Sequence, residues 1–374
     1  MRSSSQFPLP ERYSRLADPA LLPVARWVFA GIIMLVIQVL LGGITRLTGS
    51  GLSITEWNIV TGTLPPLNAA QWQEAFDKYR QTPQFRLINF DFGLSEFKFI
   101  FFWEWLHRLW ARLVGVVFVV GFVWLLAKRN IKSTMWQPLI ILFLLGALQG
   151  AVGWIMVLSG LSGDAIYVQP VKLALHFIFA MGLIVYACWF LLQLTIPPQE
   201  YVHNRNIRRW TTWIVAALFF QLLYGALMAG HKAASAAPTW PTINGDWIPD
   251  VASIRAPMRF LIANKILIQF IHRGIAYLIL VMISIWTIKA YSLQAVPAYF
   301  ELSRWMPLAL VLIQIILGVM TLLYSPGIVA NHWVAFDWLA QAHQLIGMLL
   351  LLTMVAMLYL VNRPRPVRPV KEEL

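Results

Sequence analysis

Cysteine is nearly absent from this chain of 374 residues, in which Cys188 is the only one. A single thiol excludes a disulfide within the chain and any metal site built from several cysteines. Cys188 lies inside an apolar segment, where a free cysteine usually acts as a small core residue. Any metal bound by this protein therefore needs other ligands.

Charged residues are also scarce, at 12% of the sequence, which is about half the share found in a typical soluble domain. Hydrophobic residues make up 59%, and the mean hydropathy is positive. Apolar runs of about 20 residues, the length of a membrane-crossing helix, recur along the chain. We therefore predict an all-α integral membrane protein in contact with lipid. The net charge of +13 then reflects topology and anionic lipid rather than nucleic-acid binding.

The apolar runs predict eight transmembrane helices. They lie at residues 25–44, 105–127, 136–158, 170–194, 208–229, 266–289, 305–324 and 337–361. The two longest connections, residues 45–104 and 230–265, are expected to be external loops. In the first, Asn68 is placed to cap a short helix that ends near Gln81 and carries aromatic residues on one face.

Basic residues in the short loops predict the orientation of the chain. The loops after the second and fourth spans are rich in lysine and arginine, whereas the links after the third and seventh carry at most one. Because basic short loops stay on the cytoplasmic side, we expect cytoplasmic tails at residues 1–24 and 362–374. The first tail lacks the apolar core of a signal peptide. We expect a bacterial inner membrane, with the mitochondrial inner membrane as the alternative.

Two motifs recur at matched positions. The odd-numbered spans share the pattern Gln-x-x-x-Gly, and each even-numbered span carries one histidine near its start. The Gln-x-x-x-Gly motifs begin at Gln38, Gln149, Gln221 and Gln314. Gln149 and Gln314 are 165 residues apart, and so are His107 and His272. This equal spacing indicates a duplicated unit of four spans.

The duplication predicts two tandem four-helix bundles, residues 25–200 and 201–361. Each unit has an even number of spans, so the two have the same orientation and a pseudo-twofold axis along the membrane normal. The Gln-x-x-x-Gly pattern has two explanations at this point. It provides either close helix packing with amide hydrogen bonds, or room beside the glycine for a flat macrocycle.

The four repeated histidines are candidate metal ligands. They are His107, His176, His272 and His343. Each lies about five to seven residues into its helix, so all four share one depth below the external boundary. Two histidines per bundle, without a repeated carboxylate or thiolate, suit the two axial positions of haem iron better than zinc. We predict one bis-histidine haem site in each half.

The two halves differ beside the first histidine. Glu104 lies three residues before His107, whereas Gln269 holds the matching position before His272. A lone carboxylate there could transfer protons, stabilise positive charge or act as a nucleophile, or it could simply pair with Arg108. Arg108 and Arg273 follow the two histidines and are placed to bind either haem propionates or lipid phosphates.

At these residues the chain resembles the haem A synthase family. The similar stretches are Gly49-Ser-Gly-Leu-Ser-Ile-Thr-Glu-Trp57 and Phe97-Lys-Phe-Ile-Phe-Phe-Trp-Glu-Trp-Leu-His-Arg108, which are closest to its proteobacterial and mitochondrial branch. The resemblance implies oxidation of the C8 methyl of haem O to a formyl group, giving haem A for cytochrome c oxidase. Other members carry cysteine pairs in external loops; this chain has none, which is typical of a cysteine-free branch.

The resemblance also implies roles for the site residues. His107 and His176 would hold the substrate or product haem, His272 and His343 would hold haem b, and Glu104 would be the catalytic acid. Haem O synthase and an unidentified electron donor would be partners, and the chain is a candidate homo-oligomer. Two alternative functions remain open: a dihaem cytochrome b that oxidises quinol, and a haem transporter or chaperone. The contrast between Glu104 and Gln269 argues against pure electron transfer.

Overall fold

The computed structural model describes residues 19–57, 61–249, 260–328 and 333–361. Within these ranges the regular structure is helical, and eight helices are long and apolar enough to cross a membrane. The eight are α1 (Leu22–Leu47), α4 (Leu94–Ala127), α5 (Trp136–Leu158), α6 (Pro170–Thr195), α7 (Arg205–Gly230), α9 (Lys265–Tyr291), α11 (Met306–Leu323) and α12 (Ala335–Leu360). The predicted all-α membrane protein with eight spans is confirmed.

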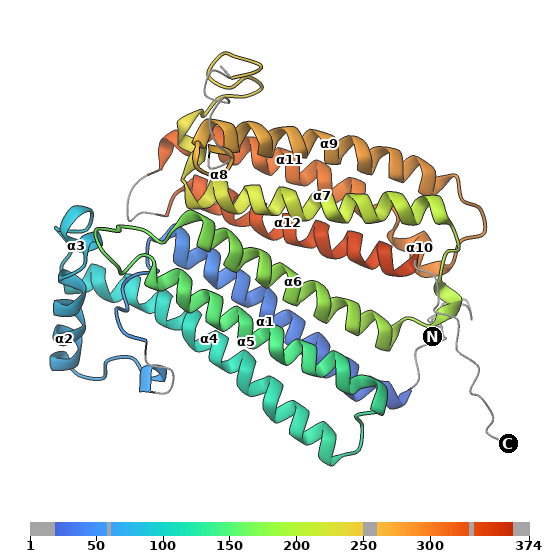
Figure 1. The fold of residues 1–374 in the computed structure, drawn as a ribbon, viewed down its shortest axis with the longest axis horizontal. Coiled ribbons are helices and arrows are strands. Elements are labelled where there is room, and N and C mark those ends of the chain that lie inside the picture. The colour runs from blue at the N-terminus through green and yellow to red at the C-terminus, as the bar shows by residue number, and fades with distance from the viewer. Residues whose placement is uncertain (1–18, 58–60, 250–259, 329–332, 362–374) are drawn as a thin grey trace, which may run out of the picture.

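The long helices pack against one another in two groups (Figure 1). Helix α1 packs on α4 and α6, and α5 packs on α6. Helix α7 packs on α9 and α12, and α11 packs on both of these. Contacts of α1 with α12, and of α6 with α7 and α12, join the two groups (Figure 1). This arrangement is consistent with two four-helix bundles.

One apolar core crosses between the two groups. It brings Val39 of α1 and Ile184 of α6 together with Ile214 of α7 and Leu351 of α12. Helix association in lipid depends on such close packing, because lipid tails are as apolar as the side chains. The predicted tail at 362–374 and most of that at 1–24 lie outside the described residues.

The largest difference from the predicted spans is at α4, which begins at Leu94 rather than near residue 105. The Glu96 carboxylate accepts a hydrogen bond from the Gly93 backbone N–H at 3.0 Å, which caps this earlier start. The helix has 34 residues and is about 51 Å long, so it projects well beyond a hydrocarbon core of about 30 Å. Residues 94–104, which we predicted to be the end of the external loop, are therefore helical.

The projecting end of α4 supports a small external layer, seen at the left of Figure 1. It contains α2 (Ala69–Arg80) and α3 (Pro83–Leu87). As predicted, the Asn68 side chain caps α2 by accepting a hydrogen bond from the Gln71 N–H at 2.9 Å. Tyr79 of α2 is fully buried and packs against Phe97 of α4. Burial raises the pKa of the Tyr79 phenol to about 12, so it remains a hydrogen-bond donor at neutral pH.

Candidate functional site

Each of the four predicted ligand histidines lies against the glutamine of one Gln-x-x-x-Gly motif. The Nε2 atoms of Gln38 and Gln149 are 3.2 Å from the Nδ1 atoms of their histidines, and those of Gln221 and Gln314 are 3.3 Å from Nε2. The pairs are Gln38 with His107, Gln149 with His176, Gln221 with His272, and Gln314 with His343. The sequence repeat is thus a repeat of side-chain contacts.

The glycine of each motif makes room for the same histidine ring. A Cβ atom on Gly153 would lie 2.8 Å from Cε1 of His176, and one on Gly318 would lie 2.9 Å from Cε1 of His343. Gly42 and Gly225 lie in the same way against His107 and His272. Each motif glycine therefore allows close packing, but the group packed against it is an imidazole ring rather than a helix backbone.

The paired histidines come from neighbouring even-numbered spans. The ring centroids of His272 on α9 and His343 on α12 are 6.3 Å apart. Two imidazoles bound to opposite sides of one metal ion have centroids about 6 Å apart, since each metal–nitrogen bond is about 2 Å. Nδ1 of His343 lies 3.1 Å from the Gln314 carbonyl oxygen, so Nε2, which faces the Gln314 amide at 3.3 Å, is the nitrogen left to bind either that amide or a metal. His107 on α4 and His176 on α6 hold the matching positions in the N-terminal half.

The polar atoms around the histidines also fit a haem. The side-chain oxygens of all four motif glutamines are buried, and none has a hydrogen-bond partner among the described residues. Buried polar atoms of this kind are costly unless a ligand or water completes them. Among the described residues, no group of three or more His, Cys, Asp or Glu side chains is arranged to hold a metal ion. Two histidines at each site instead match a macrocycle that supplies the remaining ligands.

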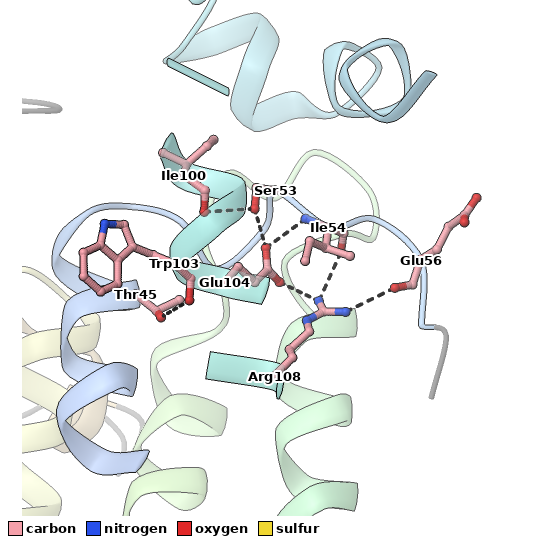
Figure 2. Close-up of polar contacts among 8 residues, drawn as sticks. All are labelled: Thr45, Ser53, Ile54, Glu56, Ile100, Trp103, Glu104 and Arg108. Atoms are coloured by element: carbon pink, nitrogen blue, oxygen red, sulfur yellow. Dashed lines mark hydrogen bonds and ion pairs between the residues drawn. The ribbon is translucent and has the colours of Figure 1, made fainter. Parts of the chain in front are cut away.

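Glu104 is buried, with 2% of its surface exposed, and three donors surround its carboxylate (Figure 2). Oε2 accepts hydrogen bonds from Ser53 Oγ at 2.7 Å and from the Ile54 N–H at 2.8 Å. Oε1 forms an ion pair with Arg108 at 2.5 Å. The pairing with Arg108 that the sequence suggested is therefore present, and the loop after α1 contributes the other two donors.

Arg108 is engaged by the same loop. Its guanidinium donates to the carbonyl oxygens of Ile54 and Glu56, each at 3.1 Å, and lies 5.2 Å from the centre of the Trp57 ring. These contacts hold the loop against α4. The same guanidinium N–H groups were predicted to bind a haem propionate or a lipid phosphate. That role of Arg108 stays a prediction.

The second half repeats this arrangement without the charge. Arg273 donates to Gln269 Oε1 at 3.1 Å and to loop carbonyl oxygens, including that of Thr242 at 3.1 Å. Gln269 Nε2 donates to the Ala233 carbonyl oxygen at 3.3 Å, in the loop after α7. Both positions thus fasten an external loop, and only Glu104 adds a carboxylate.

The sequence does not show the partners of Glu104 or those of the histidines. Ser53 lies in the conspicuous stretch Gly49–Trp57, but nothing in that stretch shows which side chain it meets 51 residues later. The motif glutamines were identified by their repetition, whereas their contact with the histidines depends on how the helices pack.

Comparisons with known proteins identify the family of this chain. Residues 25–355 match the model of the COX15-CtaA family, described as cytochrome oxidase assembly protein. The chain is 40% identical to the heme A synthase of Paracoccus denitrificans over 88% of its own length and 85% of the relative. It is 36% identical to that of Flavobacterium johnsoniae over 90% and 97%, and 40% identical to that of Brucella anthropi over 81% and 84%.

Proposed function

The chain belongs to the COX15-CtaA family of cytochrome oxidase assembly proteins, and from this premise we propose that it is a heme A synthase. It is a multi-pass membrane oxidoreductase of haem A biosynthesis. Its reaction oxidises the C8 methyl of haem O to the formyl group of haem A. The observation that carries this proposal is the repeated Gln–Gly–His contact in both halves, combined with a carboxylate in only one.

The two histidine pairs have different roles in this proposal. His107 and His176 bind the substrate or product haem, because Glu104 lies in their half. His272 and His343 bind haem b, whose chemistry when bound is one-electron transfer. The C-terminal half needs no acid for that task, which agrees with Gln269 at the position of Glu104.

Glu104 is the proposed catalytic acid of the N-terminal half. Its carboxylate lies one helical turn from His107, and Ser53, Ile54 and Arg108 fix its position. Fixed charges contribute most where water is excluded, and Glu104 is buried. A carboxylate held there can accept a proton when the methyl group is oxidised, or stabilise positive charge on the reacting carbon.

The cellular setting follows from the same proposal. The basic loops and both tails face the cytoplasm of a bacterial cell, so the histidines and Glu104 lie towards the external side of the inner membrane. Haem O synthase supplies the substrate, and an unidentified electron donor serves the haem b site. The two halves are tandem four-helix bundles related by a pseudo-twofold axis, and the chain self-associates in the membrane.

The test is the identity of the haems in the full-length protein purified from a host that makes haem O. Acid extraction, chromatography and mass spectrometry should yield haem b together with haem O or haem A. If only haem b were extracted, the proposal would be contradicted and the chain would instead be a dihaem cytochrome b. Haem O without any formyl product, in a strain with active electron supply, would indicate a transporter or chaperone.

A further inference from the structure

Arg46, near the end of α1, is a partly buried cation that the site described above does not use. Gln38, Gly42 and Arg46 are spaced four residues apart, so they lie along one side of the helix. Gln38 and Gly42 both contact His107. Arg46 therefore lies about 6 Å further along the helix axis than Gly42, above the first histidine on the external side.

The guanidinium of Arg46 is incompletely paired. Its Nε is buried and has no hydrogen-bond partner. Asp337 of α12 attracts its charge, yet within the described residues the two side chains form no direct ion pair. The Asp337 carboxylate instead accepts a hydrogen bond from the Val334 N–H, in the first turn of α12, where the helix dipole favours a negative charge.

A second unpaired donor lies on α4, where that helix contacts the same end of α1. Thr45 Oγ1 donates to the Trp103 carbonyl oxygen at 3.3 Å, which places Trp103 of α4 next to the end of α1 (Figure 2). The Trp103 indole points away from Glu104, and its Nε1 is buried without a partner. Two buried donors without acceptors, one of them charged, are suited to the two oxygens of a carboxylate.

These donors have no counterpart in the C-terminal half. The repeat that relates Gln38 to Gln221 relates Arg46 to Ala229, and the one that relates His107 to His272 relates Trp103 to Ile268. Gln269 and Arg273 nevertheless bond to each other and to the external loop in that half, as Glu104 and Arg108 do in the first. Arg46 and Trp103 are therefore not part of the architecture that the two halves share, and they belong to the half that holds the proposed substrate site.

We infer that Arg46 and Trp103 bind a propionate carboxylate of the tetrapyrrole held between His107 and His176. This inference rests on the proposed function. The oxidised C8 methyl shares its pyrrole ring with one propionate. A charged anchor on that propionate consequently fixes which edge of the macrocycle faces the external side, where Glu104 lies. Arg46 is thus a substrate-binding residue that selects the methyl group to be oxidised.

The experiment compares haem O with its dimethyl ester, whose propionates carry no charge. The full-length protein, purified with haem b but without haem O, is titrated with each and followed by absorbance. The wild type should bind the acid about tenfold to a hundredfold more tightly than the ester, the range expected for a charged hydrogen bond. Arg46→Gln should bind both forms equally, and Arg46→Lys should retain part of the preference.

Arg304→Gln is the matched control, because Arg304 also has a buried Nε without a partner but lies before α11, at the opposite end of the bundle. It should keep the wild-type preference. An Arg46→Gln protein that still prefers the acid would overturn the inference, and so would a wild type that does not distinguish acid from ester. The second result does not depend on how any variant folds. A wild type that binds haem O in neither form would instead contradict the proposed function.

Discussion

At the scale of single residues, position 104 separates structural from chemical requirements. Glu104 and Gln269 occupy equivalent helical positions, and both bond an arginine four residues later and the loop after the preceding span. Fastening the loop therefore does not require a carboxylate. The negative charge of Glu104 costs desolvation that Gln269 avoids, which is more consistent with a chemical role than with loop attachment.

Replacing Glu104 with glutamine tests this separation. Glu104→Gln should keep the fold and the haem b content, because Arg108 can donate to the amide oxygen as Arg273 does to Gln269. Haem A formation should fall about 10²- to 10⁴-fold, the usual contribution of a general acid or base. Both quantities are measured by haem extraction from the purified variant.

The reciprocal change, Gln269→Glu, is the control for Glu104→Gln. It places a carboxylate beside Arg273 in the other half and should leave haem A formation in place. Unchanged haem A production by Glu104→Gln would remove Glu104 from the mechanism.

At the scale of helices, pairs of elements define the site. Each odd-numbered span presents a glutamine and a glycine to a histidine on an even-numbered span. Helix α4 does more than cross the membrane. Its external end packs on α2, and its Glu104 accepts a hydrogen bond from the loop after α1. The hydropathy of residues 94–104 does not show this, since the segment includes Glu96, Lys98 and Glu104.

Helix α5 contains a pair of glycines that tests the glycine contact. Gly153→Ala should displace His176, because the added Cβ would lie 2.8 Å from Cε1 of the ring. We expect the haem O and haem A content to fall several-fold while haem b remains, as measured by extraction. The fall follows from the loss of axial-ligand geometry.

Gly150→Ala is the matched control on the same helix, since a Cβ at Gly150 has no atom within 4 Å. It should leave both haems in place, and alanine should if anything favour the helix. Equal loss of haem from both variants would mean that Gly153 acts through helix packing in general rather than through His176.

At the scale of the whole molecule, the two halves depend on one another. The apolar core is shared between them, and α1, α6, α7 and α12 form the contact. The ends of α6 and α7 approach closely at Gly230, where a Cβ would lie 2.9 Å from Cα of Pro170. Backbone atoms cannot turn aside as a side chain can, so only glycine fits there without a shift of a helix.

Gly230→Val should therefore separate the ends of α6 and α7. We expect a loss of about 1–3 kcal/mol of stability, the usual cost of overpacking, and reduced content of both haems. Thermal denaturation of the purified protein measures the first and haem extraction the second. Gly182→Ala on α6, where a Cβ would meet no atom within 4 Å, should behave like the wild type; a Gly230→Val protein equal to it would contradict this account of the junction.

The sequence by itself determined the membrane class, the eight spans, the repeat and the identity of the candidate ligands. These depend on apolar length and on spacing along the chain, which are local properties. It also singled out Glu104, because comparing the two repeats requires no coordinates. The resemblance carried by Gly49–Trp57 and Phe97–Arg108 led to the family that the comparisons then confirmed.

Only the tertiary structure decided which residues meet. The contacts of Gln38 with His107, and of Ser53 with Glu104, depend on the rotation and depth of each helix relative to its neighbours. Periodicity defines the faces of a helix but not the face that a neighbour covers, because that choice follows from packing of the whole bundle. For the same reason, the sequence shows Arg46 only as one of 29 Lys and Arg, whereas the structure shows that its Nε is buried without a hydrogen-bond partner among the described residues.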